Sequence, residues 1–195
     1  MLVLEELIQM DGGELHGLMD SGHPLDPEAM ADTQYTGVDL SLPPLLSKLL
    51  WKTFRKTFHK DPDSGVLRGW NVKMQQNGVD GPALPLTDPK GRAKTFGHYH
   101  LRSAQGIAFP RAWRGSDYLD YTCAGNKFMD VARFGFTPLV AVNEGSSDLL
   151  LGWELFKLGP LFLPLPLYYA LRIHGPLEEL VEVPRAPKSP NQSRK

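Results

Sequence analysis

The stretch VLRGWNVKMQQ, residues 66–76, decides the fold, because the apolar pattern of the chain changes its period there. Apolar and polar side chains alternate along it, with Trp70, Val72 and Met74 in one set and Asn71, Lys73 and Gln75 in the other. Successive residues of a β-strand point to opposite faces, so this alternation is typical of a strand. We therefore expect a strand here and further strands in the residues that follow.

Strand candidates lie on both sides of this stretch. They cover residues 34–40, 93–104, 117–123, 137–144, 148–156 and 167–174, and Gly145-Ser146-Ser147 has the length and chemistry of a hairpin turn. Turns and loops separate the strands from residue 66 onward, which favours an antiparallel sheet. About six to eight such strands close well into a small barrel that holds one ligand. The sequence predicts a mainly β (α+β) fold, an antiparallel β-barrel or strongly curved sheet formed by residues 34–40 and 66–174.

Helical patterns precede most of the strands. Leu4 and Leu7 suit one face of a short N-terminal helix, and Asp26 with Pro27 has the pattern of an N-cap followed by proline in the first turn. The stretch SLPPLLSKLLWKTFRKTFHKD, residues 41–61, repeats leucine and phenylalanine at helical spacing. It predicts a helix over about 43–59 that covers the sheet or the barrel mouth. Its basic side chains, among them Lys48, Lys52 and Lys56, are expected to be exposed.

Length and charge restrict the organisation of the chain and its partners. The 195 residues, 42% of them apolar, suffice for one domain with a real core, which we place at residues 1–182. The proline-rich basic tail at 183–195 has no apolar pattern and is expected to be disordered. The net charge of -1 gives no basic excess, so nucleic acid is not an expected partner. The sequence does not indicate the oligomeric state.

Cysteine content and the apolar segments bear on the compartment. Cys123 is the single cysteine, which excludes an internal disulfide and a cysteine-based metal site, and neither a metal nor a cofactor is expected. The opening MLVLEELIQMDGGE carries acids where a signal peptide carries lysine or arginine. Residues 149–171 are apolar but are interrupted by Glu154, Lys157 and three prolines, so buried strands are expected there rather than a membrane-spanning helix. We therefore expect a cytoplasmic location.

The segment Asp61-Pro62-Asp63-Ser64-Gly65 places alternating acids before a glycine, as a calcium-binding loop does. Such a loop starting at Asp61 requires a bidentate glutamate at its twelfth position, which in this chain is Val72. Aspartate, proline, serine and glycine are also the common residues of turns. The segment therefore predicts a turn.

The segment Thr33-Gln34-Tyr35-Thr36-Gly37 resembles the Gly-x-Trp-x-Gly opening of bacterial lipocalin-like proteins. Tyr35 stands at the aromatic position and Gly37 at the second glycine, whereas Thr33 replaces the first glycine. The resemblance implies a barrel of the calycin type with an apolar lumen. It implies no catalytic residues.

The stretch TFGHYHL, residues 95–101, places His98 and His100 on one face of a predicted strand and Tyr99 on the other. In one interpretation Tyr99 and Leu101 face the core and the histidines face outward. In the other, Phe96, His98, His100 and Arg102 line the lumen, where Arg102 needs a carboxylate partner or an anionic ligand. Imidazoles in the lumen would donate to a polar head group or carry protons near neutral pH.

Three function classes fit these patterns, and the first is a binding protein for a hydrophobic or amphipathic small molecule in the lumen, with an acidic head group as one option. Its candidate ligand-binding residues are Trp70, His98, Tyr99, His100, Arg102, Trp153 and Tyr169. The second class is a cofactor-independent acid–base enzyme, such as an isomerase, cyclase or dehydratase. Its candidate catalytic residues are His98, His100, Asp120 and Tyr118. The patterns favour a binding protein over an enzyme.

The third class is a peripheral membrane or partner-binding protein. A basic amphipathic helix at 41–60 has the composition of helices that lie on anionic membranes. Its contact residues would be Lys48, Lys52, Arg55 and Lys56.

Overall fold

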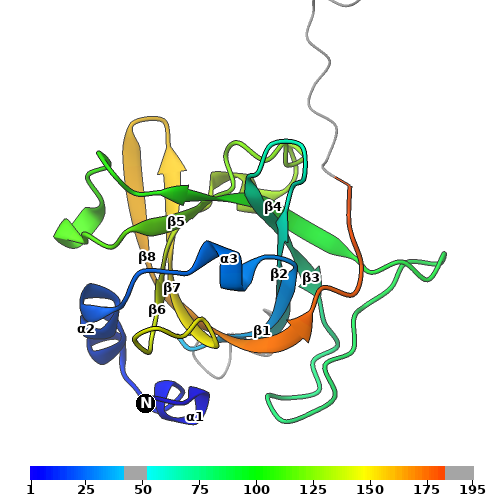
Figure 1. The fold of residues 1–195 in the computed structure, drawn as a ribbon, viewed down its shortest axis with the longest axis horizontal. Helices are drawn as coiled ribbons and strands as arrows, with labels where there is room; N and C mark the ends of the chain where they lie inside the picture. The colour runs from blue at the N-terminus through cyan, green and yellow to red at the C-terminus, as the bar shows by residue number, and fades with distance from the viewer. Residues whose placement is uncertain (42–51, 183–195) are drawn as a thin grey trace, which may run out of the picture.

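The computed structural model describes residues 1–41 and 52–182, and these residues form a closed β-barrel (Figure 1). Within them, eight antiparallel strands pair each with the next along the chain, and the last strand pairs with the first. The strands are β1 Thr33–Asp39, β2 Thr53–Lys60, β3 Leu67–Lys73, β4 Thr95–Ser103, β5 Asp117–Asp120, β6 Phe136–Ala141, β7 Leu149–Leu158 and β8 Leu161–Pro176. The predicted mainly β antiparallel barrel is confirmed.

Short helices precede the barrel and cover parts of it. They are α1 Leu4–Leu7, α2 Gly12–Ser21 and α3 Pro27–Met30, and 3₁₀ turns follow at η1 Pro110–Ala112 and η2 Val131–Phe134. Helices α1 and α2 pack outside β7 and β8, whereas α3 lies across one end of the ring of strands (Figure 1). The Asp26 carboxylate accepts hydrogen bonds from the first-turn N–H groups of Glu28 and Ala29, so the predicted N-cap is confirmed.

The predicted covering helix over 43–59 is wrong where the structure describes it, because residues 53–60 form strand β2; residues 42–51 lie outside the described part. Residues four apart share a face in a helix and also in a strand, so the spacing of Phe54 and Phe58 fits both. Lys52 is exposed as expected, but Lys56 is 1% exposed and points into the barrel. Lys48 lies outside the described residues.

Both faces of the sheet are buried over much of the barrel. The inner face carries one apolar cluster, which includes Met30, Tyr35, Phe58, Tyr99, Leu119, Tyr121, Leu139, Leu150, Tyr169 and Leu171. A second cluster lies between the outer face and helices α1 and α2, and it includes Leu4, Leu7, Leu15, Met19, Trp113, Tyr118, Phe136 and Trp153. A third forms on the outer face of β3 around Trp70, Val72 and Met74, packed against Leu177 and Val181. A strand buried on both sides explains why β3 has almost no exposed residue.

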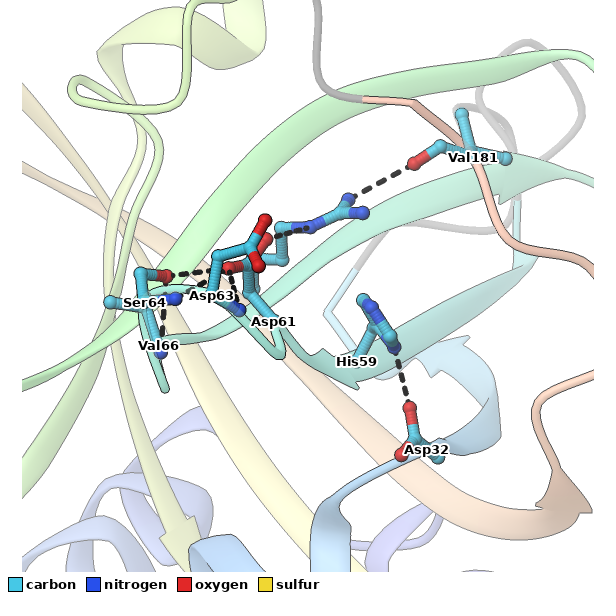
Figure 2. A network of polar contacts seen from close by, with 8 residues as sticks. Asp32, His59, Asp61, Asp63, Ser64, Val66 and Val181 are labelled. Atoms are coloured by element: carbon cyan, nitrogen blue, oxygen red, sulfur yellow. Dashed lines mark hydrogen bonds and ion pairs between the residues drawn. The ribbon is translucent and has the colours of Figure 1, made fainter.

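The segment 61–65 joins β2 to β3 as a turn, as predicted. The Asp61 carboxylate accepts hydrogen bonds from the Ser64 N–H and the Ser64 hydroxyl, both at 2.8 Å, and Gly65 adopts a φ of 69° (Figure 2). Close by, Arg68 donates to the Val181 carbonyl and pairs with Asp61, which ties the C-terminal segment to the barrel wall. The carboxylate that resembled a calcium ligand therefore organises its own turn.

Residues 149–171 form most of the β7–β8 hairpin, so the expectation of strands in this apolar stretch is confirmed. Across residues 1–41 and 52–182, no helix is long and apolar enough to cross a membrane.

Packing inside the barrel predicts that alanine substitutions at two phenylalanines of β2 lower the free energy of unfolding by different amounts. Phe58 is 0% exposed and makes edge contacts with the rings of Tyr35 and Tyr99 at 5.5 and 5.6 Å, whereas Phe54 is only half-buried. We expect Phe58→Ala to lower the free energy of unfolding by about 3–5 kcal/mol, and Phe54→Ala by about 1–2 kcal/mol. Denaturant unfolding measures both values, and equal losses would contradict this description of the core.

Candidate functional site

A cavity of about 340 Å³ lies inside the barrel at the end opposite α3. This volume is near the lower limit of small-molecule pockets, about 300–1,000 Å³. Its apolar walls come from Phe54, Phe96, Ala132, Phe156, Leu165 and Leu167. Its polar wall comes from Asp39, Lys56, Asn71, Tyr121 and Glu154. The cavity thus has an apolar body and one polar side.

Lys56 dominates the polar side. Its Nζ donates to the Asn71 side-chain oxygen at 2.8 Å and to the Tyr121 hydroxyl at 2.6 Å. Aromatic rings surround the same nitrogen, with ring centroids 4.6–5.6 Å away, and they belong to Tyr99, Tyr169, Tyr121 and Phe54. Hydrogen bonds and cation–π contacts of this kind offset part of the cost of removing an ammonium group from water.

Burial changes the pKa values of the two charged groups that face each other in this cavity. Desolvation lowers the pKa of Lys56 to about 7, and the nearby Glu154 carboxylate opposes that shift. Desolvation raises the pKa of Glu154, while the charge of Lys56 and the hydrogen bond from the Thr137 hydroxyl, at 3.2 Å, oppose the increase. Burial thus favours the neutral form of both groups, and pKa shifts of this kind are common at functional sites.

The tyrosines around Lys56 stay protonated over the physiological range. Burial raises the pKa of Tyr99, Tyr121 and Tyr169 well above the ordinary value of a phenol. The Tyr99 hydroxyl donates to the Thr57 carbonyl at 2.6 Å. The Tyr169 hydroxyl is buried and has no hydrogen-bond partner among residues 1–41 and 52–182. A buried donor without a partner costs stability, so this hydroxyl is a weak point of the inner core.

Gly152 has no side chain, and the Tyr169 ring occupies the space that a side chain would fill. A Cβ added to Gly152 would lie 2.2 Å from the Tyr169 ring carbon next to the hydroxyl and 2.5 Å from the hydroxyl oxygen. Any larger side chain would therefore displace the ring from the position where it faces Lys56.

A bulge in β4 positions the polar side of the cavity. Gly97 has a φ of 52°, which glycine adopts easily, and the pairing of β3 with β4 shifts register there. The Gly97 carbonyl accepts a hydrogen bond from the Asn71 amide at 3.0 Å, which orients the Asn71 oxygen toward Lys56. The Asn126 side chain bonds both the N–H and the carbonyl of His98 at 2.7 Å and so fixes the bulge from outside.

The structure brings two of the predicted ligand-binding residues, Tyr99 and Tyr169, next to Lys56 inside the barrel. Trp153 lies instead in the outer core, where its ring N–H donates to the Leu165 carbonyl. Trp70 lies on the outer face of β3 and packs near the His98 ring, with centroids 6.3 Å apart.

The histidine pair does not line the lumen. Tyr99 belongs to the inner cluster, so His98 and His100 point to the outer side of β4, and the interpretation that placed them in the lumen with Arg102 is wrong. His100 lies 3.4 Å from Cys123 Sγ, which also contacts Arg102. The physical reason is that the large ring of Tyr99 fills more of the apolar inner core than an imidazole would. Phe96 still reaches the cavity, because the bulge at Gly97 changes the alternation.

The candidate catalytic set is not assembled around a cavity. Asp120 accepts hydrogen bonds from the N–H and hydroxyl of Thr122, and it pairs across the sheet with His100. Tyr118 packs its ring against Phe136 in the outer core, 4.1 Å between centroids. Each of these groups is accounted for by local structure.

Sequence reasoning missed the central group, Lys56, together with Asn71 and Glu154. The signal was present in TFRKTFHK, where Phe54, Lys56 and Phe58 share a face at period two. Glu154 is likewise the one acid inside the apolar strand LLLGWELF.

Within the described residues, no group of three or more histidine, cysteine, aspartate or glutamate side chains is placed to hold a metal ion. Comparison of the chain with protein family models, with curated proteins and with solved structures found no match.

The burial of His98 predicts a pH dependence of stability. Desolvation, with a smaller contribution from Arg68, lowers the pKa of His98 to about 4 in the folded protein. The unfolded chain binds this proton near pH 6.5, so the free energy of unfolding should fall as the pH drops from about 6.5 to about 4. We expect His98→Gln to remove about 1–2 kcal/mol of that fall. Denaturant unfolding across this range tests it, with exposed His174→Gln as the control, and identical slopes in the two variants would contradict it.

Replacement by phenylalanine is expected to affect stability differently at Tyr99 and at Tyr169, two tyrosines inside the barrel. Tyr99→Phe leaves the Thr57 carbonyl without its donor and should lower the free energy of unfolding by about 1–3 kcal/mol. Tyr169→Phe removes an unpartnered hydroxyl and should leave that free energy unchanged within about 0.5 kcal/mol or raise it. Thermal and denaturant unfolding measure both, and a large loss in Tyr169→Phe would show that its hydroxyl has a partner.

Proposed function

We propose that the protein binds a hydrophobic or amphipathic small molecule in the lumen of the barrel. The observation that carries this proposal is the cavity of about 340 Å³ with Lys56 at its polar side and phenylalanine and leucine walls elsewhere. A ligand with an apolar body and one polar end matches this distribution, because each part meets the surface it prefers. Eight-stranded barrels have room for one such ligand.

The charges lining the cavity bear on the polar end of the ligand. Asp39 and Glu154 line the same cavity as Lys56, so a single cation faces two carboxyl groups. Adding a ligand carboxylate would place a third acidic group there, at a cost from like-charge repulsion. We therefore favour a neutral polar end with an oxygen acceptor, such as a carbonyl or hydroxyl oxygen, over the acidic head group.

The resemblance to lipocalin-like proteins and the cytoplasmic location remain parts of this proposal. The closed antiparallel barrel supports the first. The second rests on the single cysteine, Cys123, which is an exposed free thiol of the kind that reducing compartments preserve.

The other two function classes receive no support from the geometry. The acid–base enzyme required His98, His100, Asp120 and Tyr118 in one pocket, and they lie outside the barrel. The membrane-binding surface required a helix, but Arg55 is buried against Glu178 and the Ala83 carbonyl, and Lys56 faces the lumen.

Filling the cavity tests the proposal. We expect the protein to bind the neutral apolar dye Nile red with saturation at one dye per chain. Leu167→Trp places a larger ring in the cavity and should weaken binding by about tenfold or more, which corresponds to about 1.4 kcal/mol. Fluorescence titration measures the dissociation constants.

Leu163→Trp is the matched control, because it makes the same change on the same strand at a residue that is 49% exposed and outside the cavity lining. It should bind Nile red as the unmodified chain does. Thermal unfolding of both variants establishes that they are folded. Equal weakening in the two variants, or no saturable binding by the unmodified chain, would refute the lumen as the binding site.

A further inference from the structure

We propose that Lys56 captures a ligand carbonyl group covalently, as an imine. The inference rests on the proposed function, because an aldehyde or ketone must first enter the cavity in the barrel. It goes further in naming the chemical class of the ligand and the atom that binds it.

Lys56 is placed for this reaction. It lines the cavity together with Asn71 and Tyr121, the two residues that accept its hydrogen bonds. An ammonium group has three N–H donors, so these two bonds hold the nitrogen in place and leave one position for a third partner. The Lys56 side chain is 1% exposed, so this position is reached through the cavity.

The surroundings of Lys56 supply the neutral amine that attack on a carbonyl requires. Aromatic rings centred 4.6–5.6 Å from Nζ replace most of the water that an ammonium group prefers. A lysine desolvated in an apolar pocket is a recognised activated nucleophile. Its pKa, lowered by this burial to about 7, leaves a substantial neutral fraction near neutral pH, while an exposed lysine is almost fully charged.

Glu154 is placed to move the protons. Glu154 lines the same cavity, and burial raises its pKa, which favours the protonated carboxyl group. The Tyr121 hydroxyl lies 2.6 Å from Nζ. The Tyr121 hydroxyl thus holds Nζ in place, and proton transfer by a carboxyl group in the same cavity is ordinary general acid–base catalysis.

The step balances without any further reactant. The lone pair of neutral Nζ forms a bond to the carbonyl carbon, and the π pair of the carbonyl moves to oxygen. The oxygen takes a proton from the Glu154 carboxyl group, and the resulting carboxylate takes one from Nζ, giving a carbinolamine. Glu154 then returns this proton to the hydroxyl group, which leaves as water while the nitrogen lone pair forms the C=N bond of a protonated imine. Nothing is oxidised or reduced, and hydrolysis reverses the step.

The site stabilises the positively charged product of this reaction as well as the lysine from which it forms. A protonated imine keeps the single positive charge of Lys56, which the Glu154 carboxylate and the faces of the Tyr99 and Tyr169 rings then stabilise.

Reductive trapping tests the proposal. The protein is incubated with a small excess of hexanal and sodium cyanoborohydride near pH 7, which converts an imine to a stable secondary amine. We expect intact-mass spectra to show one hexyl group per chain at early times, and peptide mapping to place it on Lys56. Labelling of Lys56 should exceed that of Lys60, a residue of the same strand whose side chain is 41% exposed and pairs with Glu28, by about tenfold or more.

Two controls connect the label to the site. Lys56→Met should abolish the single early label, and Lys60→Met, which removes the same charge from the same strand, should keep it. Because Lys56→Met removes the donor to Asn71 and Tyr121, the unmodified chain provides a second control: excess Nile red should protect Lys56 from hexanal and leave Lys60 unaffected. The labelling rate of Lys56 should rise through neutral pH and level off above about pH 8, because its pKa is lowered to about 7.

The outcomes separate the two proposals. Saturable Nile red binding with Lys56 labelled no faster than Lys60 would overturn the imine and leave the binding function standing. Rapid labelling of Lys56 without Nile red binding would support the imine and overturn the apolar ligand. Rapid labelling of Lys56 that Nile red does not prevent would overturn the shared site.

Discussion

The buried ammonium group of Lys56 is the constraint on which the inner half of the barrel depends. Removing a charged amine from water costs several kcal/mol unless hydrogen bonds and nearby charges offset that cost. Here the offset comes from Asn71, Tyr121 and the surrounding rings, and from Glu154 at longer range. Asn71 is oriented in turn by the β4 bulge at Gly97, which Asn126 and Asp130 fix from outside. The site is therefore held by a chain of contacts that crosses three strands.

The apolar residues form separate clusters, and burial in the outer clusters stabilises the barrel enough to offset the cost of a polar interior. Helices α1 and α2 cover the outer face of β7 and β8, and the C-terminal segment covers β3. These outer clusters bury large side chains such as Trp153 and Trp70 without using the lumen. The stability gained outside allows one end of the lumen to remain a cavity, while α3 and the rings of Tyr35 and Phe58 fill the other end.

Several features of the fold could be predicted from local sequence because short-range chemistry decides them. The alternation in 66–76 identifies β3, aspartate before proline identifies the start of α3, and the composition of 61–65 identifies a turn. Residues 41–60 were harder, because phenylalanines four apart satisfy both a helix and a strand. Period two in TFRKTFHK, together with β-branched Thr53 and Thr57, was the better guide to β2.

The sequence by itself determined an antiparallel barrel or strongly curved sheet, since most of the strands carry a period of two, although it indicated a helix where β2 lies. It did not determine which face of each strand points inward. Both faces of β4 carry rings, and closure of the barrel, with β8 paired to β1, assigned Tyr99 to the lumen and His98 to the outside. Only closure brings Lys56 of β2, Asn71 of β3 and Glu154 of β7 to one cavity, because strands distant in sequence become neighbours across the lumen. Local patterns carry no information about such contacts, so the tertiary structure alone decided where the site lies.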